Sequence, residues 1–246
     1  MGYIVCHNIV KTYGQGPSAV NAIDGVSFSI DSGEFVAVMG ESGAGKSTLL
    51  SILGTMNTPT AGRYLVDDID VYGLTGEQQA DFRREYLGFV FQSFHLIPYL
   101  SVIENVMLPL TTVKLPRRAK RSMAMEALAW VGMDSKAARL PNQISGGEME
   151  RAAIARAIVN NPPVLLADEP TGNLDSQNSQ AVMELLGRLH RNGTTIIMVT
   201  HSAACAQCAQ RVLRVSDGRL APTKPSVAEN RTANFMAYAL KTAKVN

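Results

Sequence analysis

Residues 40–47 read Gly-Glu-Ser-Gly-Ala-Gly-Lys-Ser, and this stretch decides the fold. The run from Phe35 to Met39 before it is apolar, as in a buried strand, and helix-forming residues follow from 46 to 54. Strand, glycine loop and helix in this order are the context of a phosphate-binding loop, where backbone N–H groups surround phosphates at a helix N-terminus. A glycine-rich turn without a ligand is the alternative. The pattern favours a nucleotide site.

The residue types in this loop have separate predicted tasks. The ammonium of Lys46 is expected to contact the β- and γ-phosphates, and the hydroxyl of Ser47 is expected to bind Mg²⁺. The ligands predicted from this loop are therefore a nucleotide and Mg²⁺. The nucleotide-binding residues expected in and just after the loop are Gly40, Ser42, Gly43, Ala44, Gly45, Lys46, Ser47 and Thr48.

A second chemical element follows the continuous apolar run Val164 to Ala167, which predicts a strand covered on both faces. This strand ends in two adjacent carboxylates. Asp168 is expected to bind the metal, and Glu169 is expected to polarise a water molecule for in-line attack on the γ-phosphate. The alternative is a strand end that is only capped by acidic residues. Together with the phosphate loop, the pair predicts nucleotide hydrolysis.

Composition limits the class of protein. The chain has 246 residues, of which 46% are apolar and 18% are charged, so it can bury a core and is not a disordered chain. A net charge of +2 does not indicate nucleic-acid binding. The basic cluster at residues 114–121 is interpreted as a solvated helix face. Cys6, Cys205 and Cys208 do not form a disulfide framework or a complete zinc site, and they are predicted to be reduced.

The N-terminus lacks the charged and then apolar arrangement of a signal peptide, and no apolar run approaches the roughly 20 residues that cross a bilayer. A cytosolic chain is expected. Strand patterns occupy the first third, and residues 93–145 are predicted to be an inserted helical lobe. Alternating strand and helix patterns return up to about residue 220. Residues 221–246 are predicted to be a peripheral tail, and a short helix is predicted within it over 229–244.

The segment Ile144-Ser145-Gly146-Gly147-Glu148 stands a short distance before the Asp168-Glu169 strand, and it resembles the signature motif of ABC ATPases. The resemblance covers about residues 3–220. It implies an α/β fold of the ABC type, in which a P-loop ATPase domain has a mixed RecA-like sheet, an N-terminal antiparallel β subdomain and an inserted α-helical lobe. It also implies a homodimer that holds two ATP molecules head to tail. The residues expected to meet the other subunit's nucleotide are Ser145, Gly146, Gly147 and Glu148.

Other elements of the family follow in order along the chain. By this resemblance, Tyr13 stacks on adenine, and Gln92 lies near both Mg²⁺ and the attacking water. Asn173 and Asp175 belong to a loop that crosses the dimer interface, and His201 faces the γ-phosphate. The resemblance thus implies Glu169, His201 and Gln92 as catalytic residues. The implied magnesium ligands are Ser47, Gln92 and Asp168.

Residues 88–98 and 101–106 are most similar to the group of macrolide exporters, lipoprotein-releasing ATPases and a cell-division ATPase. Members of this group imply a peripheral motor on the cytoplasmic face of the inner membrane, paired with a permease that has few membrane helices and a large extracytoplasmic domain. An exporter or extractor is expected. The alternative is a mechanotransmission ATPase that controls cell-envelope hydrolases without transport. Two residues depart from the usual pattern of the group: Ile144 replaces Leu, and Glu150 replaces a frequent Gln.

Overall fold

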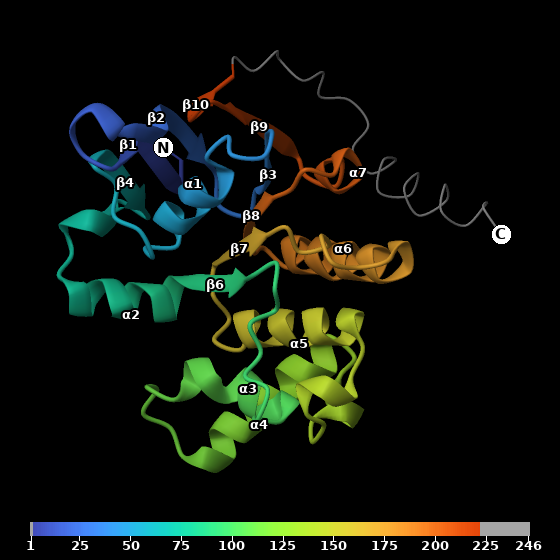
Figure 1. Cartoon of the computed structure of the whole chain (residues 1–246). Coiled ribbons are helices and arrows are strands. Elements are labelled where there is room, and N and C mark those ends of the chain that lie inside the picture. Colours follow the sequence, from blue (N-terminus) through green and yellow to red (C-terminus); the bar gives the residue numbers. More distant parts are fainter. Residues whose placement is uncertain (1, 222–246) are drawn as a thin grey trace.

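The computed structural model describes residues 2–221. Six strands form a mixed sheet in the order β10-β9-β3-β8-β7-β6. All neighbours from β9 to β6 are parallel, and only β10 runs antiparallel. The strands are β3 (Phe35–Met39), β6 (Leu87–Val90), β7 (Val164–Asp168), β8 (Thr195–Val199), β9 (Arg211–Ser216) and β10 (Arg219–Leu220). Figure 1 shows these strands stacked from β6, near the middle of the view, up to β9 and β10 at the top.

The strands at the centre of this sheet are apolar throughout because both of their faces are covered. Along β3, Phe35 and Ala37 belong to one buried cluster, and Val36 and Val38 belong to another. Strands β7 and β8 divide in the same alternating way. The predicted strands at 35–39 and 164–167 are thus confirmed, and the sheet lies between two cores.

A second sheet has four antiparallel strands in the order β2-β1-β4-β5. They are β1 (Ile4–Tyr13), β2 (Val20–Ile30), β4 (Ala61–Val66) and β5 (Ile69–Asp70). Register shifts interrupt the pairing of β1 after Cys6, next to Asn8, which has a φ of +49°. The expected mixed core and antiparallel β subdomain are both present, so the predicted fold class is confirmed.

Helices cover the mixed sheet on both sides. The helix α1 (Lys46–Leu53) packs within the cluster shared with the antiparallel sheet, and α6 (Ser176–Arg191) packs on the opposite side. The apolar face of α6 is buried through Val182, Leu186 and Leu189. The other helices of this part are α2 (Gly76–Tyr86), α7 (Ala203–Ala206) and the 3₁₀ turns η1 (Gly16–Ser18) and η2 (Val71–Gly73).

The segment between β6 and β7 is helical, and Figure 1 shows α5 between the sheet and the pair α3 and α4. Ser101 begins this segment's first helix, since Glu104 accepts from the Ser101 backbone N–H in a capping box. The elements are α3 (Val102–Met107), η3 (Leu108–Leu110), α4 (Arg117–Trp130), η4 (Asp134–Lys136), η5 (Pro141–Gln143) and α5 (Gly146–Ile158).

Further expectations from the sequence concern the basic helix face, the cysteines and membrane-spanning segments. Arg117, Arg118 and Arg121 are exposed at the start of α4, as expected for a solvated helix face. The three cysteines are free. Among residues 2–221, no helix is both long enough and apolar enough to cross a bilayer, and no group of three His, Cys, Asp or Glu side chains forms a metal cluster. The helix expected at 229–244 lies outside the described residues.

Candidate functional site

The phosphate loop connects β3 to α1 and touches strands of both sheets. Gly43 and Gly45 have φ values of +80° and +101°, which side-chain-bearing residues rarely adopt. A Cβ atom on Gly45 would lie 2.2 Å from the carbonyl oxygen of Ala22 in β2, and one on Gly40 would lie 2.1 Å from that of Val215 in β9. These two glycines therefore permit a close backbone approach on either side of the loop.

Lys46 is the first residue of α1, and its side chain turns back over the loop. It is 8% exposed, and its Nζ donates to the carbonyl oxygens of Gly40 at 2.9 Å and Glu41 at 2.8 Å. An ammonium held this way places a positive charge next to the N–H groups at the start of a helix. Both features favour an anion such as a phosphate group.

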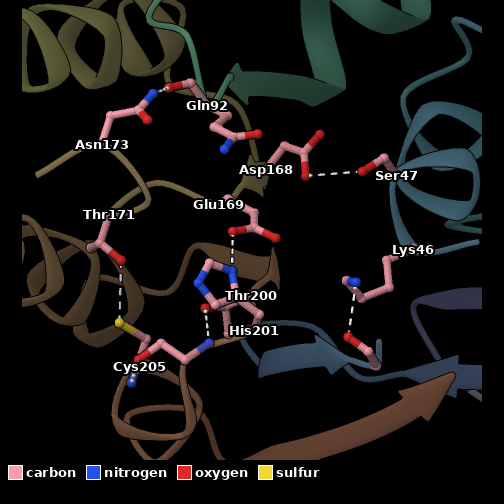
Figure 2. A network of polar contacts seen from close by, with 12 residues as sticks. Lys46, Ser47, Gln92, Asp168, Glu169, Thr171, Asn173, Thr200, His201 and Cys205 are labelled. Carbon is pink, nitrogen blue, oxygen red and sulfur yellow. Dashed lines mark hydrogen bonds and ion pairs between the residues drawn. The ribbon is translucent and has the colours of Figure 1, made fainter. Parts of the chain in front are cut away.

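The two carboxylates at the end of β7 lie opposite the loop (Figure 2). The Ser47 hydroxyl donates to Asp168 Oδ1 at 3.4 Å, and the Glu169 carboxylate contacts the Nδ1 atom of His201. Glu169 has a φ of +47°, and its N–H donates to the Val199 carbonyl at 2.9 Å. Its side chain thus leaves the strand in a direction fixed by the backbone.

Gln92, the second residue after β6, completes this group. The side chain of Asn173 donates to the backbone carbonyl oxygen of Gln92 at 2.8 Å. On the same loop, the Thr171 hydroxyl lies 3.3 Å from Cys205 Sγ, in the helix that follows His201 (Figure 2). Three segments that are distant in the sequence are therefore tied together around the carboxylates.

Part of this group lines one polar cavity with a volume of about 530 Å³, whereas Asp168, Thr171, Asn173 and Cys205 are outside its lining. Sequence reasoning identified all of its lining residues except Ala22, whose backbone, not its side-chain type, carries the contact with the loop. The lining consists of Ala22, Ser42, Gly43, Gly45, Lys46, Ser47, Thr48, Gln92, Glu169 and His201.

Burial, and after it the neighbouring Glu169 carboxylate, raise the pKa of Asp168. A carboxylate that is desolvated and repelled by a second carboxylate gains from a bound cation. The hydroxyl of Ser47 and the carboxylate of Asp168 are hard oxygen donors of the kind that Mg²⁺ selects. The residues present thus fit a magnesium ion next to a phosphate chain.

The segment 144–148 lies apart from the cavity, at the start of α5. Ser145 is exposed and caps this helix in a capping box with Glu148, whose carboxylate also contacts Lys136. A Cβ atom on Gly147 would lie 2.0 Å from Asn178 Oδ1 in α6, and Asp175 caps α6 by accepting from the Asn178 N–H at 2.8 Å. Within one chain, neither Ser145 nor Asp175 reaches the cavity lining.

Comparison with protein families agrees with this geometry. A family model described as ABC transporter matches residues 23–172, which include the phosphate loop, the segment 144–148 and the carboxylates of β7. The chain belongs to the ABC transporter family. It is an ATPase of that family, and its fold is that of the ATP-binding cassette.

Individual ABC relatives are similar over most of the chain. The ATP-binding protein YvrO of Bacillus subtilis is 43% identical over 217 residues, which cover 88% of this chain and 95% of that protein. The lipoprotein-releasing ATP-binding protein LolD of Syntrophotalea carbinolica is 46% identical over 87% of this chain and 94% of that protein. The macrolide export ATP-binding/permease protein MacB of Chlorobaculum tepidum is 47% identical over 86% of this chain. The chain spans 32% of the length of that MacB protein.

Solved ABC structures are similar as well. A dimeric post-hydrolysis state of the ATP-binding cassette MJ0796, bound to ADP and Pi, has a TM-score of 0.83 at 39% sequence identity, over 90% of this chain and 97% of that one. The cassette cbiO1 of Clostridium perfringens has a TM-score of 0.82 at 28% identity, over 98% of this chain. These structures support the confirmed ABC fold.

Tyr13 lies at the end of β1, away from the lining of the cavity. The residue is 46% exposed, Lys11 Nζ lies 5.1 Å from the centroid of its ring, and its hydroxyl contacts the Asn57 amide. An exposed ring beside a cation can take a planar base on its free face. The adenine-stacking role of Tyr13 stays a prediction.

Glu150, a departure from the usual ABC pattern, is almost completely buried in α5. It is 1% exposed, and its Oε1 atom has no hydrogen-bond partner within the described structure. Burial raises the pKa of Glu150 to about 8, and the charge of Arg156 opposes this shift. The carboxyl group is therefore protonated at neutral pH in the folded chain.

We expect Glu150→Gln to change how stability depends on pH. A carboxyl group whose pKa is raised in the folded state leaves the free energy of unfolding unchanged at pH values below its unfolded pKa near 4.5. It lowers the free energy of unfolding increasingly as the pH rises towards about 8. The free energy of unfolding of the wild type should fall relative to Glu150→Gln by about 3 kcal/mol between pH 5 and pH 7.5. Denaturant titrations of both proteins at the two pH values measure this difference, and parallel pH profiles would contradict it.

Proposed function

We propose that this ATPase works as a head-to-tail homodimer that drives a separate membrane permease. The observation that carries the proposal is the division of the site within one chain. The cavity holds the phosphate loop, Gln92, Glu169 and His201, whereas Ser145 lies exposed at the start of a different helix. A second copy that presented its Ser145 and the N-terminus of its α5 would supply hydrogen-bond donors and a helix dipole to the γ-phosphate.

The residue roles follow from this arrangement. The phosphate loop and Lys46 bind the phosphates, while Ser47, Asp168 and Gln92 would hold Mg²⁺, which would supply positive charge to neutralise the phosphate chain. Glu169 accepts the proton of the attacking water, and its contact with His201 keeps its carboxylate turned into the cavity. Asn173 and Asp175 would lie at the dimer interface, near the partner's nucleotide.

A groove on the surface near the Gln92 loop is the proposed docking site for the permease. It lies between α2, β6 and η3, has a volume of about 410 Å³, and its apolar lining includes Met56, Phe89, Phe91 and Leu108. Met56 is 52% exposed at its edge. A cytoplasmic helix of the permease inserted here would touch the strand that leads directly to Gln92. The chain would then be a peripheral protein on the cytoplasmic face of the membrane.

Relatives named for macrolide export and for lipoprotein release support a motor of one of these two types. The permease of the proposed complex has few membrane helices and a large extracytoplasmic domain. No observation favours a mechanotransmission role without transport. Because the permease carries the substrate contacts in such a complex, the choice of transported molecule is expected to depend on that subunit.

Purification of the Glu169→Gln chain from its own membranes in Mg-ATP tests this proposal. The variant is expected to stay in the ATP-bound dimer and to retain a permease with few spans and a large external domain, identified by mass spectrometry. Lys46→Ala is the matched control and should retain less permease. A conventional multi-span permease would overturn the subgroup, and recovery of soluble partners alone would overturn the transport role.

A further inference from the structure

Arg156 connects the helix of the signature motif to the loop of Gln92. It lies near the end of α5, 11 residues after Ser145. Its Nη1 donates to the backbone carbonyl oxygen of His95 at 2.5 Å, and its Nη2 donates to that of Phe94 at 2.6 Å. A planar guanidinium that donates two bonds to successive carbonyl groups fixes both the position and the orientation of the loop.

The backbone that Arg156 holds has an unusual conformation. Phe94 and His95 have φ values of +58° and +49°, two consecutive left-handed residues without a glycine. Such residues persist only when surrounding contacts hold them. The loop also forms a tight turn, since the Phe94 N–H donates to the Phe91 carbonyl at 3.1 Å. Gln92 lies inside this turn, so its backbone follows the turn's position.

Arg156 also borders the groove described above. The groove lining includes Arg156 together with Phe89 and Phe91, whose rings stack with centroids 4.3 Å apart. On the other side of the turn, Asn173 holds the Gln92 carbonyl. The turn is therefore fixed on one side by the signature helix and on the other by the predicted dimer loop.

We propose that Arg156 is a positioning residue for ATP hydrolysis, which sets Gln92 in the cavity relative to the signature motif. It touches neither the nucleotide site nor the carboxylates, and it acts through two backbone carbonyl groups. The inference rests on the proposed role of Gln92. It adds that movement of α5, whether caused by a second copy or by an occupant of the groove, reaches Gln92 through this guanidinium.

Steady-state ATPase assays of folded variants test the proposal. Displacement of a catalytic group by about 1 Å can cost about 10²-fold in rate, so Arg156→Gln should lower kcat by about 10- to 100-fold with little change in KM for ATP. Arg156→Lys keeps the charge and can still donate to one carbonyl, so its kcat should lie between those of the wild type and Arg156→Gln. Arg139→Gln, an exposed arginine of the helical lobe, is the matched control and should match the wild type.

The combination with Gln92→Ala separates positioning from a general structural role. If Arg156 acts through Gln92, the second substitution adds little to the loss caused by the first, whereas a structural defect would multiply the two losses. Arg156→Lys carries the test should Arg156→Gln not fold. Wild-type kcat in a folded Arg156 variant, or fully multiplicative losses, would overturn the inference. Wild-type kcat in Gln92→Ala would instead overturn the proposed role of Gln92.

Discussion

Glu169→Gln is expected to lower the rate of ATP hydrolysis by about 10²- to 10⁴-fold, while ATP affinity changes by less than about threefold. The substitution keeps the side-chain volume, and the backbone bond from the Glu169 N–H to the Val199 carbonyl is unaffected. What is lost is the carboxylate that accepts a proton from water. Single-turnover hydrolysis and equilibrium binding of a fluorescent ATP analogue measure the two quantities separately.

The matched control for this experiment is Glu184→Gln, a substitution at an exposed residue of α6 outside the cavity. It should hydrolyse ATP at the wild-type rate. Wild-type turnover in Glu169→Gln would remove Glu169 from the catalytic role. Loss of ATP binding in that variant would show instead that its carboxylate is needed to build the site.

Lys46→Ala is expected to weaken ATP binding itself, by about 10- to 100-fold, as follows from the loss of a hydrogen-bonded charge. The side chain is 8% exposed, and the substitution also removes its two bonds to the loop carbonyls. Equilibrium titration with ATP in the presence of Mg²⁺ measures the effect.

Lys120→Ala is the control for removing a lysine that donates to a backbone carbonyl group. The Lys120 ammonium likewise donates to a backbone carbonyl, that of Thr111 at 3.1 Å, but it lies in the helical lobe. ATP affinity should be unchanged in this variant. Unchanged affinity in Lys46→Ala would contradict the assignment of residues 40–47 as the phosphate-binding loop.

The apolar runs made the central sheet predictable. A strand covered on both faces needs apolar side chains at every position, and both Phe35 to Met39 and Val164 to Ala167 meet that requirement. The first strand was not predictable in this way, because the polar pair at 7–8 and the left-handed Asn8 interrupt its alternation and its register.

The site likewise contains residues that can be predicted from the sequence and contacts that cannot. Lys46, Ser47 and the carboxylates at 168 and 169 belong to motifs in which the residue types indicate phosphate binding, metal binding and hydrolysis. The contacts of Arg156 could not be predicted, since their acceptors are backbone carbonyl groups that any residue carries. Nor could the burial of Glu150, because a glutamate among polar residues early in a helix ordinarily faces solvent.

The glycines of the phosphate loop have a thermodynamic consequence. Gly40 and Gly45 let the loop press against the backbones of β9 and β2, so the loop is confined by both sheets. Its conformational entropy is therefore lost when the chain folds and not when the nucleotide arrives. ATP should bind with a small entropic penalty and a rapid association rate. A residue with a Cβ atom at position 45 would push the loop away from β2, and a loop released in this way would be ordered again at each binding event.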